Sequence, residues 1–199
     1  TLGFGDEIKF VLKTDNGLWT RNDTIVKTFG TGTVVFEDDC NTISNWSGDW
    51  GTTTEYYVSA GSSISDSPFS NYSNSSETEI VLNNILGFQN ATYAYVQFNA
   101  QWEIENDFDY VEFMISTDNG NNWSPLCGKY TNTGTNNQDA GSQLYDGTQN
   151  DWVLEEIDLS DYLGMDNIRF KFMLVSDNFE RGDGFAFDDF SIAAAVPNS

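Results

Sequence analysis

The sequence predicts an all-β protein: a two-sheet antiparallel jelly-roll sandwich that carries a short N-terminal β-hairpin as an appendage. Three observations lead to this fold class. Apolar and polar residues alternate with a period of two along most of the 199 residues. Clusters of turn residues separate these alternating segments at short intervals. Aromatic residues make up 15% of the chain, and signals for helices are nearly absent.

The N-terminal residues predict the hairpin. Ile8 to Lys13 and Asp23 to Phe29 read as strands, and Asp15-Asn16-Gly17 reads as a turn. A unit of this size is too short to bury a face of its own, so it packs on the sandwich or ends a domain that lies upstream. We therefore divide the chain into an appendage, a sandwich and a tail: residues 1–31, 32–194 and 195–199.

Eight segments beyond Thr33 share the composition of short strands. They are residues 34–37, 55–59, 79–82, 93–101, 110–116, 152–158, 168–176 and 184–193. Segments 93–101 and 110–116 each have one clear apolar face, and we expect both to be central. Residues 129–150 have the composition of a long loop. Residues 159–164 predict one helical turn, capped by Ser160 or Asp161 and stopped by Gly164.

The charge balance excludes several partners. Eight Lys and Arg residues stand against 31 Asp and Glu residues, which gives a formal net charge of -23. DNA and anionic membrane surfaces would be repelled, so we expect no nucleic-acid partner. No apolar run is long enough to span a bilayer and no leader segment opens the chain, so we expect no membrane insertion.

The absence of histidine narrows the possible chemistry. It removes the commonest general base and the commonest zinc ligand, so we expect no zinc in this segment. Only catalysis by a pair of carboxylates stays open, as in glycosidases. Glu103 with Glu105, or Glu155 with Glu156, are the candidates, although such pairs arise by chance in an acidic chain.

Two cysteines, Cys40 and Cys127, lie far apart in the sequence. Without a partner His they predict neither a zinc site nor a cysteine nucleophile. We expect them to form a disulfide with each other, and the alternative is that both stay unpaired. A disulfide would indicate an extracytoplasmic, oxidising compartment.

Acidic residues occupy strand positions near both ends of the predicted sandwich. Glu37-Asp38-Asp39 ends the first strand, and Asp188-Asp189 interrupts the last. Acids are poor strand formers, and carboxylates held together repel unless a cation lies between them. The first and last strands of a jelly roll are commonly neighbours, and Asp66 lies in a turn that could reach the same end. Oxygen ligands without His suit Ca²⁺, and the alternative is an acidic, solvated sheet edge.

Strand alternation separates the two acids of the last strand, so only one of them should face the metal squarely. Asp189 shares parity with Phe185 and Phe187, and we expect it to be the more buried. The predicted ligand set is therefore Glu37, Asp39, Asp66 and either Asp188 or Asp189. Asp107 and Asp109 are candidates for a second site.

Aromatic residues cluster in a polar, Gly/Ser-rich region. They are Trp46, Trp50, Tyr56, Tyr57 and Tyr72. Exposed rings of this kind form the platforms on which carbohydrate-binding modules stack sugars. The alternative is that these rings cover the edge of the core.

Residues 116–123, Ser-Thr-Asp-Asn-Gly-Asn-Asn-Trp, match the Asp-box motif S-x-D-x-G-x-x-W. The Asp accepts hydrogen bonds from the turn backbone, and the Gly supplies a positive φ. We interpret the motif as a structural turn after a strand, with the Trp packed back under it.

Taken in order, several motifs resemble the MAM-like jelly-roll domain over residues 33–193. They are residues 35–38, Trp46 and Trp50, residues 65–68, residues 108–111 with the Asp-box, and residues 183–190. The version is similar to those that follow the catalytic part of secreted bacterial metallopeptidases of the immune inhibitor A and zinc carboxypeptidase kinds. In related MAM domains a calcium ion joins acids of the first strand to acids of the last, which implies the ligand set given above.

The resemblance implies a non-catalytic, calcium-stabilised accessory domain of a secreted or cell-surface zinc metallopeptidase. It also implies that residues 1–31 end an Ig-like segment. The expected partners are the parent peptidase domain and an extracellular protein or polysaccharide. Two alternatives remain: a carbohydrate-binding module of a glycoside hydrolase, and a glycosidase that uses a carboxylate pair.

Overall fold

The computed structural model of the chain describes residues 7–15, 17–28 and 33–195. Over these residues the secondary structure is β apart from one 3₁₀ turn, η1 (Ser160–Tyr162). The predicted boundary at residues 31 and 32 and the predicted tail beyond Ala195 lie outside the described residues. No helix in the described ranges has the length and the apolar character needed to cross a membrane.

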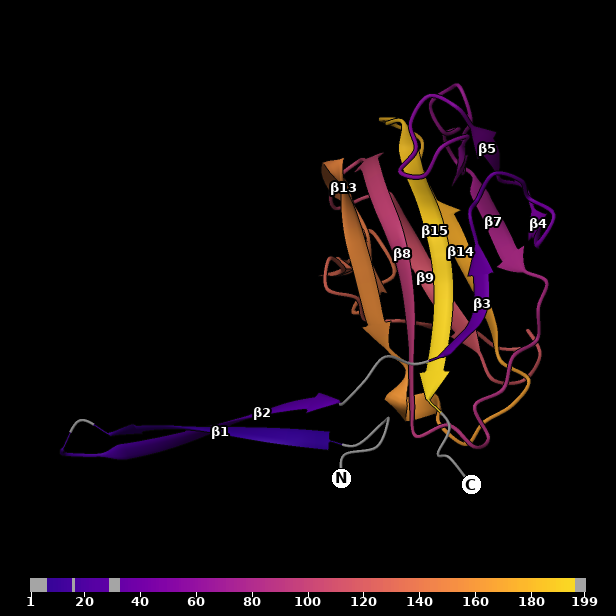
Figure 1. Cartoon of the computed structure of the whole chain (residues 1–199). Coiled ribbons are helices and arrows are strands. Elements are labelled where there is room, and N and C mark those ends of the chain that lie inside the picture. Colours follow the sequence, from indigo (N-terminus) through magenta and orange to yellow (C-terminus); the bar gives the residue numbers. More distant parts are fainter. Residues whose placement is uncertain (1–6, 16, 29–32, 196–199) are drawn as a thin grey trace.

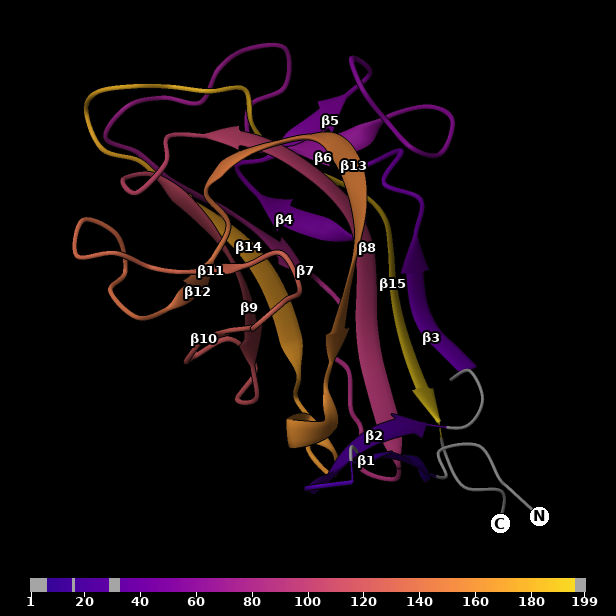
Figure 2. The same cartoon turned by 90° about the vertical axis from the view of Figure 1, so that its left-hand side faces the viewer.

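Two antiparallel sheets face each other, which confirms the predicted sandwich (Figures 1 and 2). In the described part, the first sheet runs β10 (Ser124–Pro125), β9 (Tyr110–Ser116), β14 (Arg169–Val175), β7 (Glu77–Leu82) and β4 (Trp46–Gly48). The second runs β13 (Gly147–Asp158), β8 (Tyr93–Ile104), β15 (Gly184–Ala195), β6 (Ser63–Ser65) and β5 (Gly51–Thr53). The first strand of the sandwich, β3 (Thr33–Asp38), pairs with β15, as expected of a jelly roll.

Aromatic rings from both sheets fill the space between them. Every second residue of β8 from Ala94 to Ile104 is buried, as its alternation predicts. Phe172 of β14 stacks on Phe187 of β15 with the ring centroids 4.4 Å apart, and on Phe113 of β9 at 4.5 Å. Because large rings bury most of the apolar area, this stack is the centre of the core.

The N-terminal hairpin forms a sheet of its own and projects from the sandwich (Figure 1). Its strands are β1 (Glu7–Asp15) and β2 (Thr20–Thr28). The carboxylate of Asp15 accepts hydrogen bonds from the N–H of Gly17 and the hydroxyl of Thr20, which closes the predicted turn. Apolar side chains along both strands are between 45% and 63% exposed: Phe10, Val11, Leu12, Ile25 and Val26.

The predicted strand at residues 55–59 is wrong. These residues form bends between β5 and β6. The N–H groups of Val58 and Ser59 donate to the carboxylate of Asp188, 2.7 and 3.1 Å away, instead of to a neighbouring strand. A buried side chain has therefore replaced the ladder partner that a strand would need.

The single helical turn appears where it is predicted, but its cap differs. The N-cap residue is Leu159, not Ser160 or Asp161, and it makes no side-chain cap hydrogen bond. Asp158, just before it, accepts a hydrogen bond from the N–H of Ser160 at 2.8 Å. Gly164 follows with a φ of +81°, a conformation that ends the turn and that other residues adopt at a cost.

The Asp-box forms the predicted structural turn after β9. Asp118 accepts hydrogen bonds from the side chain and the backbone N–H of Asn122, and these lower the pKa of Asp118 to about 2. The hydroxyl of Ser116 accepts a hydrogen bond from Gly120, whose φ is +91°. The ammonium group of Lys171 lies over the Trp123 ring, 5.1 Å from its centre.

Candidate functional site

An open groove lies where β3 pairs with β15. It is lined by Glu37, Asp38, Asp39, Asn45, Asp189, Phe190 and Ser191. The strand register places Ser191 opposite Glu37 and Phe190 opposite Asp38. Three of the five predicted metal ligands, Glu37, Asp39 and Asp189, therefore line one groove. We call it the calcium groove, after the ion that the sequence analysis predicts.

A β-bulge in β15 places Asp189 in this groove. Between Asp188 and Ser191 the strand contains one more residue than the facing segment of β8, Asn99 to Gln97. Asp189 adopts a φ of +51° at this point, a left-handed conformation that Asp tolerates better than most residues. Asp189 is half-buried, and the side-chain amide of Asn99 donates to it at 3.3 Å.

The expectation that Asp189 is the more buried of the two acids is wrong. Asp188 is fully buried, at 0% exposure. Its carboxylate accepts hydrogen bonds from the N–H groups of Val58, Ser59 and Asp189, and it does not line the calcium groove. Burial raises the pKa of Asp188, and these three donors oppose the rise. The bulge adds a residue to β15, so the alternation of buried and exposed side chains that we used to predict burial is interrupted at Asp188 and Asp189.

Asp66 lies in the bend after β6 and does not line the calcium groove either. Its Oδ1 accepts a hydrogen bond from the N–H of Phe185 at 2.6 Å. Its Oδ2 is buried and has no hydrogen-bond partner among the described residues. Burial raises the pKa of Asp66 to about 7.

Asp38 shapes one wall of the calcium groove. Its carboxylate accepts hydrogen bonds from the backbone N–H of Cys40, the side-chain amide of Asn45 and the indole of Trp46, all at 2.9 to 3.0 Å. Asp38 itself is 8% exposed. These three donors satisfy the buried carboxylate, which thereby fixes the segment that follows β3.

The donor set of the calcium groove fits a hard cation. The lining offers carboxylates from Glu37, Asp39 and Asp189, an amide oxygen from Asn45 and the hydroxyl of Ser191. No Lys, Arg or Cys is among the described residues that line it. Oxygen donors alone are what Ca²⁺ prefers. Among the described residues, the carboxylate oxygens of Glu37, Asp39 and Asp189 do not all lie within 4.8 Å of one another, so a shared ion would draw these side chains together.

The sequence matches a known family over most of the sandwich. The family model described as "Immune inhibitor A-like, MAM domain" matches residues 62–196. The chain belongs to this family. The resemblance indicated by the sequence motifs is thereby confirmed.

A relative and two solved structures are similar to this MAM domain. Bacillopeptidase F of Bacillus subtilis (strain 168) is 31% identical over 119 residues, which are 60% of this chain and 7% of that protein's length. The CBM22-1 xylan-binding domain of Paenibacillus barcinonensis Xyn10C has a TM-score of 0.51 at 13% identity, covering 84% of this chain and 98% of that domain. The K3 cleaved adhesin domain of Lys-gingipain from Porphyromonas gingivalis w83 has a TM-score of 0.47 at 14% identity, covering 81% and 99%. The likeness to the xylan-binding domain shows a shared β-sandwich fold.

The predicted aromatic platform is not exposed. Trp46, Trp50 and Tyr72 are only 2% to 3% exposed, and Trp46 packs edge-on against Phe187 and Phe190 in the core. Tyr56 is half-buried, and Tyr57 is exposed. These rings therefore belong mainly to the core, because a platform for sugars needs several exposed faces.

The predicted disulfide is absent, because both cysteines are free thiols in the described part of the chain. Cys40 lies in the core at 0% exposure, with its Sγ 3.7 Å from the carbonyl oxygen of Asp38. Cys127 lies on the surface just after β10, near the side chain of Gln143. One thiol points into the core and the other lies at the surface, so they cannot meet without rearrangement.

A second group of acids gathers at one end of the sandwich. Carboxylate oxygens of Glu105, Asp109 and Asp177 all lie within 4.8 Å of one another. Burial, followed by the charges of Asp177 and Asp109, raises the pKa of Glu105. Asp107, the predicted companion of Asp109, is exposed and lies outside this group. Glu105 and Asp177 were not predicted as companions of Asp109, because only the folded chain brings the loop after β14 to the β8–β9 turn.

Asp109 has a structural role within this acidic group. It is fully buried, and it accepts hydrogen bonds from the hydroxyl of Tyr72 at 2.7 Å and the N–H of Asp177 at 2.6 Å. Burial raises the pKa of Asp109. The carboxylate thereby ties together the segments that contain Tyr72 and Asp177.

The candidate catalytic pair Glu155 and Glu156 points to opposite sides of β13. Glu155 is fully buried, and Glu156 is exposed. The Glu155 carboxylate accepts hydrogen bonds from the N–H groups of Lys129 and Tyr130 and from the hydroxyl of Tyr145. It therefore anchors the start of the segment that the sequence predicts as a loop at residues 129–150. That prediction is partly wrong: β11 (Asn132–Thr133) pairs with β12 (Gln143–Leu144) inside the segment, and residues 147–150 already belong to β13.

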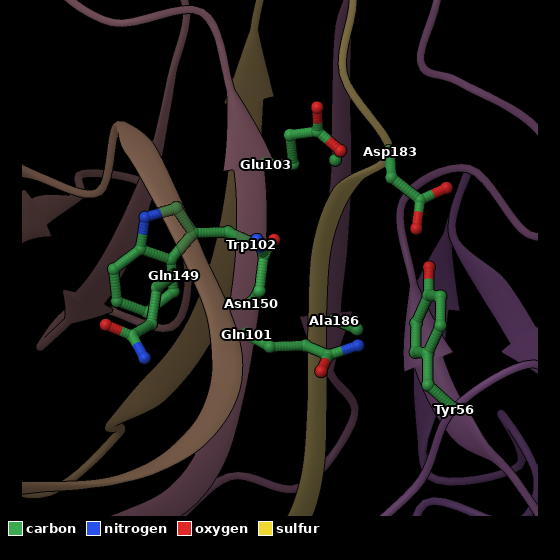
Figure 3. A pocket seen from close by; sticks show the side chains of 9 residues that line it. Tyr56, Gln101, Trp102, Glu103, Gln149, Asn150, Asp183 and Ala186 are labelled. Carbon is green, nitrogen blue, oxygen red and sulfur yellow. The ribbon is translucent and has the colours of Figure 1, made fainter.

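The sheet that contains β8 and β15 carries a small cleft (Figure 3). Its lining comes from four places: Tyr56, residues 101–103 of β8, Gln149 and Asn150 of β13, and residues 183, 184 and 186 around the start of β15. The volume of the cleft is about 50 Å³. Glu103 lines this cleft and Glu105 belongs to the acidic group described above. The two candidate catalytic acids also line a neighbouring groove together, with Glu180 and Arg181.

Proposed function

We propose that this MAM domain is a non-catalytic accessory domain of a secreted or cell-surface peptidase, and that a calcium ion stabilises it. The observation that carries the proposal is the calcium groove. Acids from opposite ends of the sequence line it, and no cationic side chain among the described residues lines it. Family membership and the match to a segment of Bacillopeptidase F support the accessory role.

In this proposal Glu37, Asp39 and Asp189 hold the ion, and Asp38 positions the segment that carries Asp39. The ion supplies positive charge that offsets the repulsion between the carboxylates. The backbone positions the ligands. The bulge in β15 directs Asp189 to the groove, and the pairing of β3 with β15 brings Glu37 beside it. A ligand that binds only the folded state stabilises that state.

Calorimetric melting of the 199-residue chain tests the calcium proposal. Addition of 1 mM Ca²⁺ to protein stripped of metal is expected to raise Tm by several degrees, about the effect of 1 to 3 kcal/mol. Asp189→Asn and Glu37→Gln should lose this response. Glu77→Gln, on the exposed start of β7, is the matched control and should keep it. An unchanged Tm after verified metal removal and calcium addition would contradict the proposal.

The parent enzyme that we propose is a secreted zinc metallopeptidase of the carboxypeptidase kind. The support is the immune inhibitor A-like family itself and the absence of His from this chain, so that His ligands for zinc must come from another part of the protein. The test is the coding sequence that flanks this segment, where a His- and Glu-containing zinc motif is expected. The catalytic residues of another peptidase class there would overturn this part.

We also propose that the hairpin of β1 and β2 belongs to an Ig-like unit that lies next to the sandwich in the parent protein. Its exposed Phe10, Val11 and Ile25 support this, because a two-stranded sheet with uncovered apolar faces is marginal alone. Removal of residues 1–31 should leave the cooperative melting of the sandwich unchanged. A large drop in Tm would instead make the hairpin part of the sandwich.

A further inference from the structure

The cleft on the β8–β15 sheet is acidic, and its Glu103 also lines a neighbouring groove that contains Arg181. Glu103 and Asp183 are its charged side chains, and no Lys or Arg is among the described residues that line it. Figure 3 shows the carboxylate of Asp183 directed toward the hydroxyl of Tyr56, with the amide of Gln101 extending toward the same side. The cleft therefore presents mostly hydrogen-bond acceptors around a narrow space.

A further carboxylate lies behind the wall of the cleft. Gly184 lines the cleft, and a Cβ at this residue would lie 2.1 Å from Oδ1 and 2.7 Å from Oδ2 of Asp66. Only glycine fits at this position. The backbone of Gly184 alone therefore separates the cleft from the carboxylate of Asp66. The Oδ2 atom of Asp66 is buried without a hydrogen-bond partner in the described ranges. Its negative charge, when present, adds to that of Glu103 and Asp183.

The cleft is poorly suited to stacking a sugar ring. The Trp102 indole is 7% exposed, and its N–H donates to the carbonyl of Asp146 at 2.9 Å. Tyr56 meets Trp152 edge-on, with an angle of 61° between the ring planes. No flat pair of rings among the described residues faces the space, whereas sugar platforms rely on such faces. A neutral polyol would also leave the repulsion between the carboxylates in place.

We propose that this cleft binds the guanidinium group of an arginine side chain. A guanidinium carries five N–H donors in one plane and pairs with carboxylates through two parallel hydrogen bonds. Asp183 and Glu103 receive the charge, and the Gln101 amide oxygen receives a further N–H. The Tyr56 ring adds a face for cation–π contact. None of these residues lines the calcium groove, so this inference stands apart from the calcium proposal.

Titrations of the ¹⁵N-labelled 199-residue chain, followed by NMR, test the proposal. The probes are N-acetyl-arginine amide, N-acetyl-citrulline amide and a neutral xylo-oligosaccharide. Citrulline keeps the shape of arginine and loses its charge, so the difference in affinity between the two probes reports the contribution of the charged group. We expect the arginine probe to shift the side-chain amides of Gln101, Gln149 and Asn150, and to bind at least about tenfold more tightly than the citrulline probe.

Matched variants distinguish binding in the cleft from the nonspecific attraction of cations to an acidic protein. Asp183→Asn and Glu103→Gln should each weaken the arginine probe about tenfold. Glu77→Gln removes one charge from the other sheet and should leave the binding unchanged. Equal binding of citrulline, equal weakening by all three variants, or binding of the oligosaccharide alone would overturn the proposal, as would no binding of any probe.

Discussion

The buried carboxylate of Asp188 accepts a hydrogen bond of 2.7 Å from the backbone N–H of Val58, a residue 130 positions earlier in the chain. The same carboxylate oxygen also accepts a hydrogen bond from the N–H of Ser59 at 3.1 Å. One side chain of the last strand thus holds the bends between β5 and β6. This contact explains both why residues 55–59 are not a strand and why Asp188 is not in the calcium groove.

Asp188→Asn is expected to lower the free energy of unfolding by about 2 to 3 kcal/mol. An amide places an NH₂ donor where one carboxylate oxygen now accepts, so at least one backbone N–H loses its partner. Urea unfolding at neutral pH measures the effect. Asp151→Asn, at an exposed residue, should change stability by less than about 0.5 kcal/mol. Equal stability of the two variants would contradict the structural role of Asp188.

The carboxyl of Glu112 predicts a pH dependence. Glu112 is 1% exposed on β9, and its Oε1 has no hydrogen-bond partner among the described residues. Asp139 from the long loop, Lys171 from β14 and Tyr110 on the same strand are the titratable groups near it. Burial, and next the charge of Asp139, raises the pKa of Glu112 from 4.5 to about 7.

Between pH 4.5 and 7 the folded protein holds a proton on Glu112 that the unfolded chain has lost, so stability from this group falls as the pH rises. Glu112→Gln has no proton to lose, so its stability should not show this fall with rising pH. We expect the variant to be more stable than the parent by up to about 3 kcal/mol at pH 8 and of equal stability at pH 4. Urea unfolding at both pH values checks this, with Glu77→Gln as control. A difference that does not vary with pH would refute the assignment.

The hydrogen bonds of the Tyr72 hydroxyl predict that its removal lowers the stability of the fold. The hydroxyl donates to Asp109 at 2.7 Å and accepts a hydrogen bond from the N–H of Glu105 at 3.1 Å. Tyr72→Phe keeps the ring in the core and removes both bonds, so it should cost about 1 to 3 kcal/mol. Thermal unfolding measures this, and Tyr57→Phe at an exposed ring should be nearly neutral. Equal Tm values for the two variants would show that the Asp109 network adds nothing.

The cysteines predict a difference in reactivity. Burial raises the pKa of the Cys40 thiol far above its ordinary value, whereas Cys127 is exposed. A thiol reagent such as Ellman's should label one thiol per native chain and two in denaturant, because the thiolate is the reacting form. Cys127→Ser should abolish the native labelling. No labelling in denaturant without a reductant would mean that the disulfide forms after all.

Period-two alternation was enough to predict the sandwich. It located β8 and β9, and it led to the correct pairing of the first strand with the last. The Asp-box was also readable, because each of its bonds is local, as between Asp118 and Asn122. Structural features that are stabilised by contacts between residues close in the sequence can be predicted from the sequence.

Only part of the candidate site could be predicted from the sequence. Glu37, Asp39 and Asp189 could be grouped because strands of known parity carry them, but the bulge at Asp189 could not be predicted. That bulge reversed the expected burial of Asp188 and Asp189. Similarly, nothing near Trp46 or Tyr72 in the sequence distinguishes a core ring from an exposed platform.

By itself, the sequence determined the fold class, the acidic character of the first and last strands of the sandwich, and the absence of histidine chemistry. Only the tertiary structure decided which carboxylates line a groove and which bind backbone N–H groups. The physical reason is that a buried carboxylate must find donors, and the donors for Asp188 and Asp109 come from segments far away in the chain. Such long-range partners exist only once the two sheets have closed over the core.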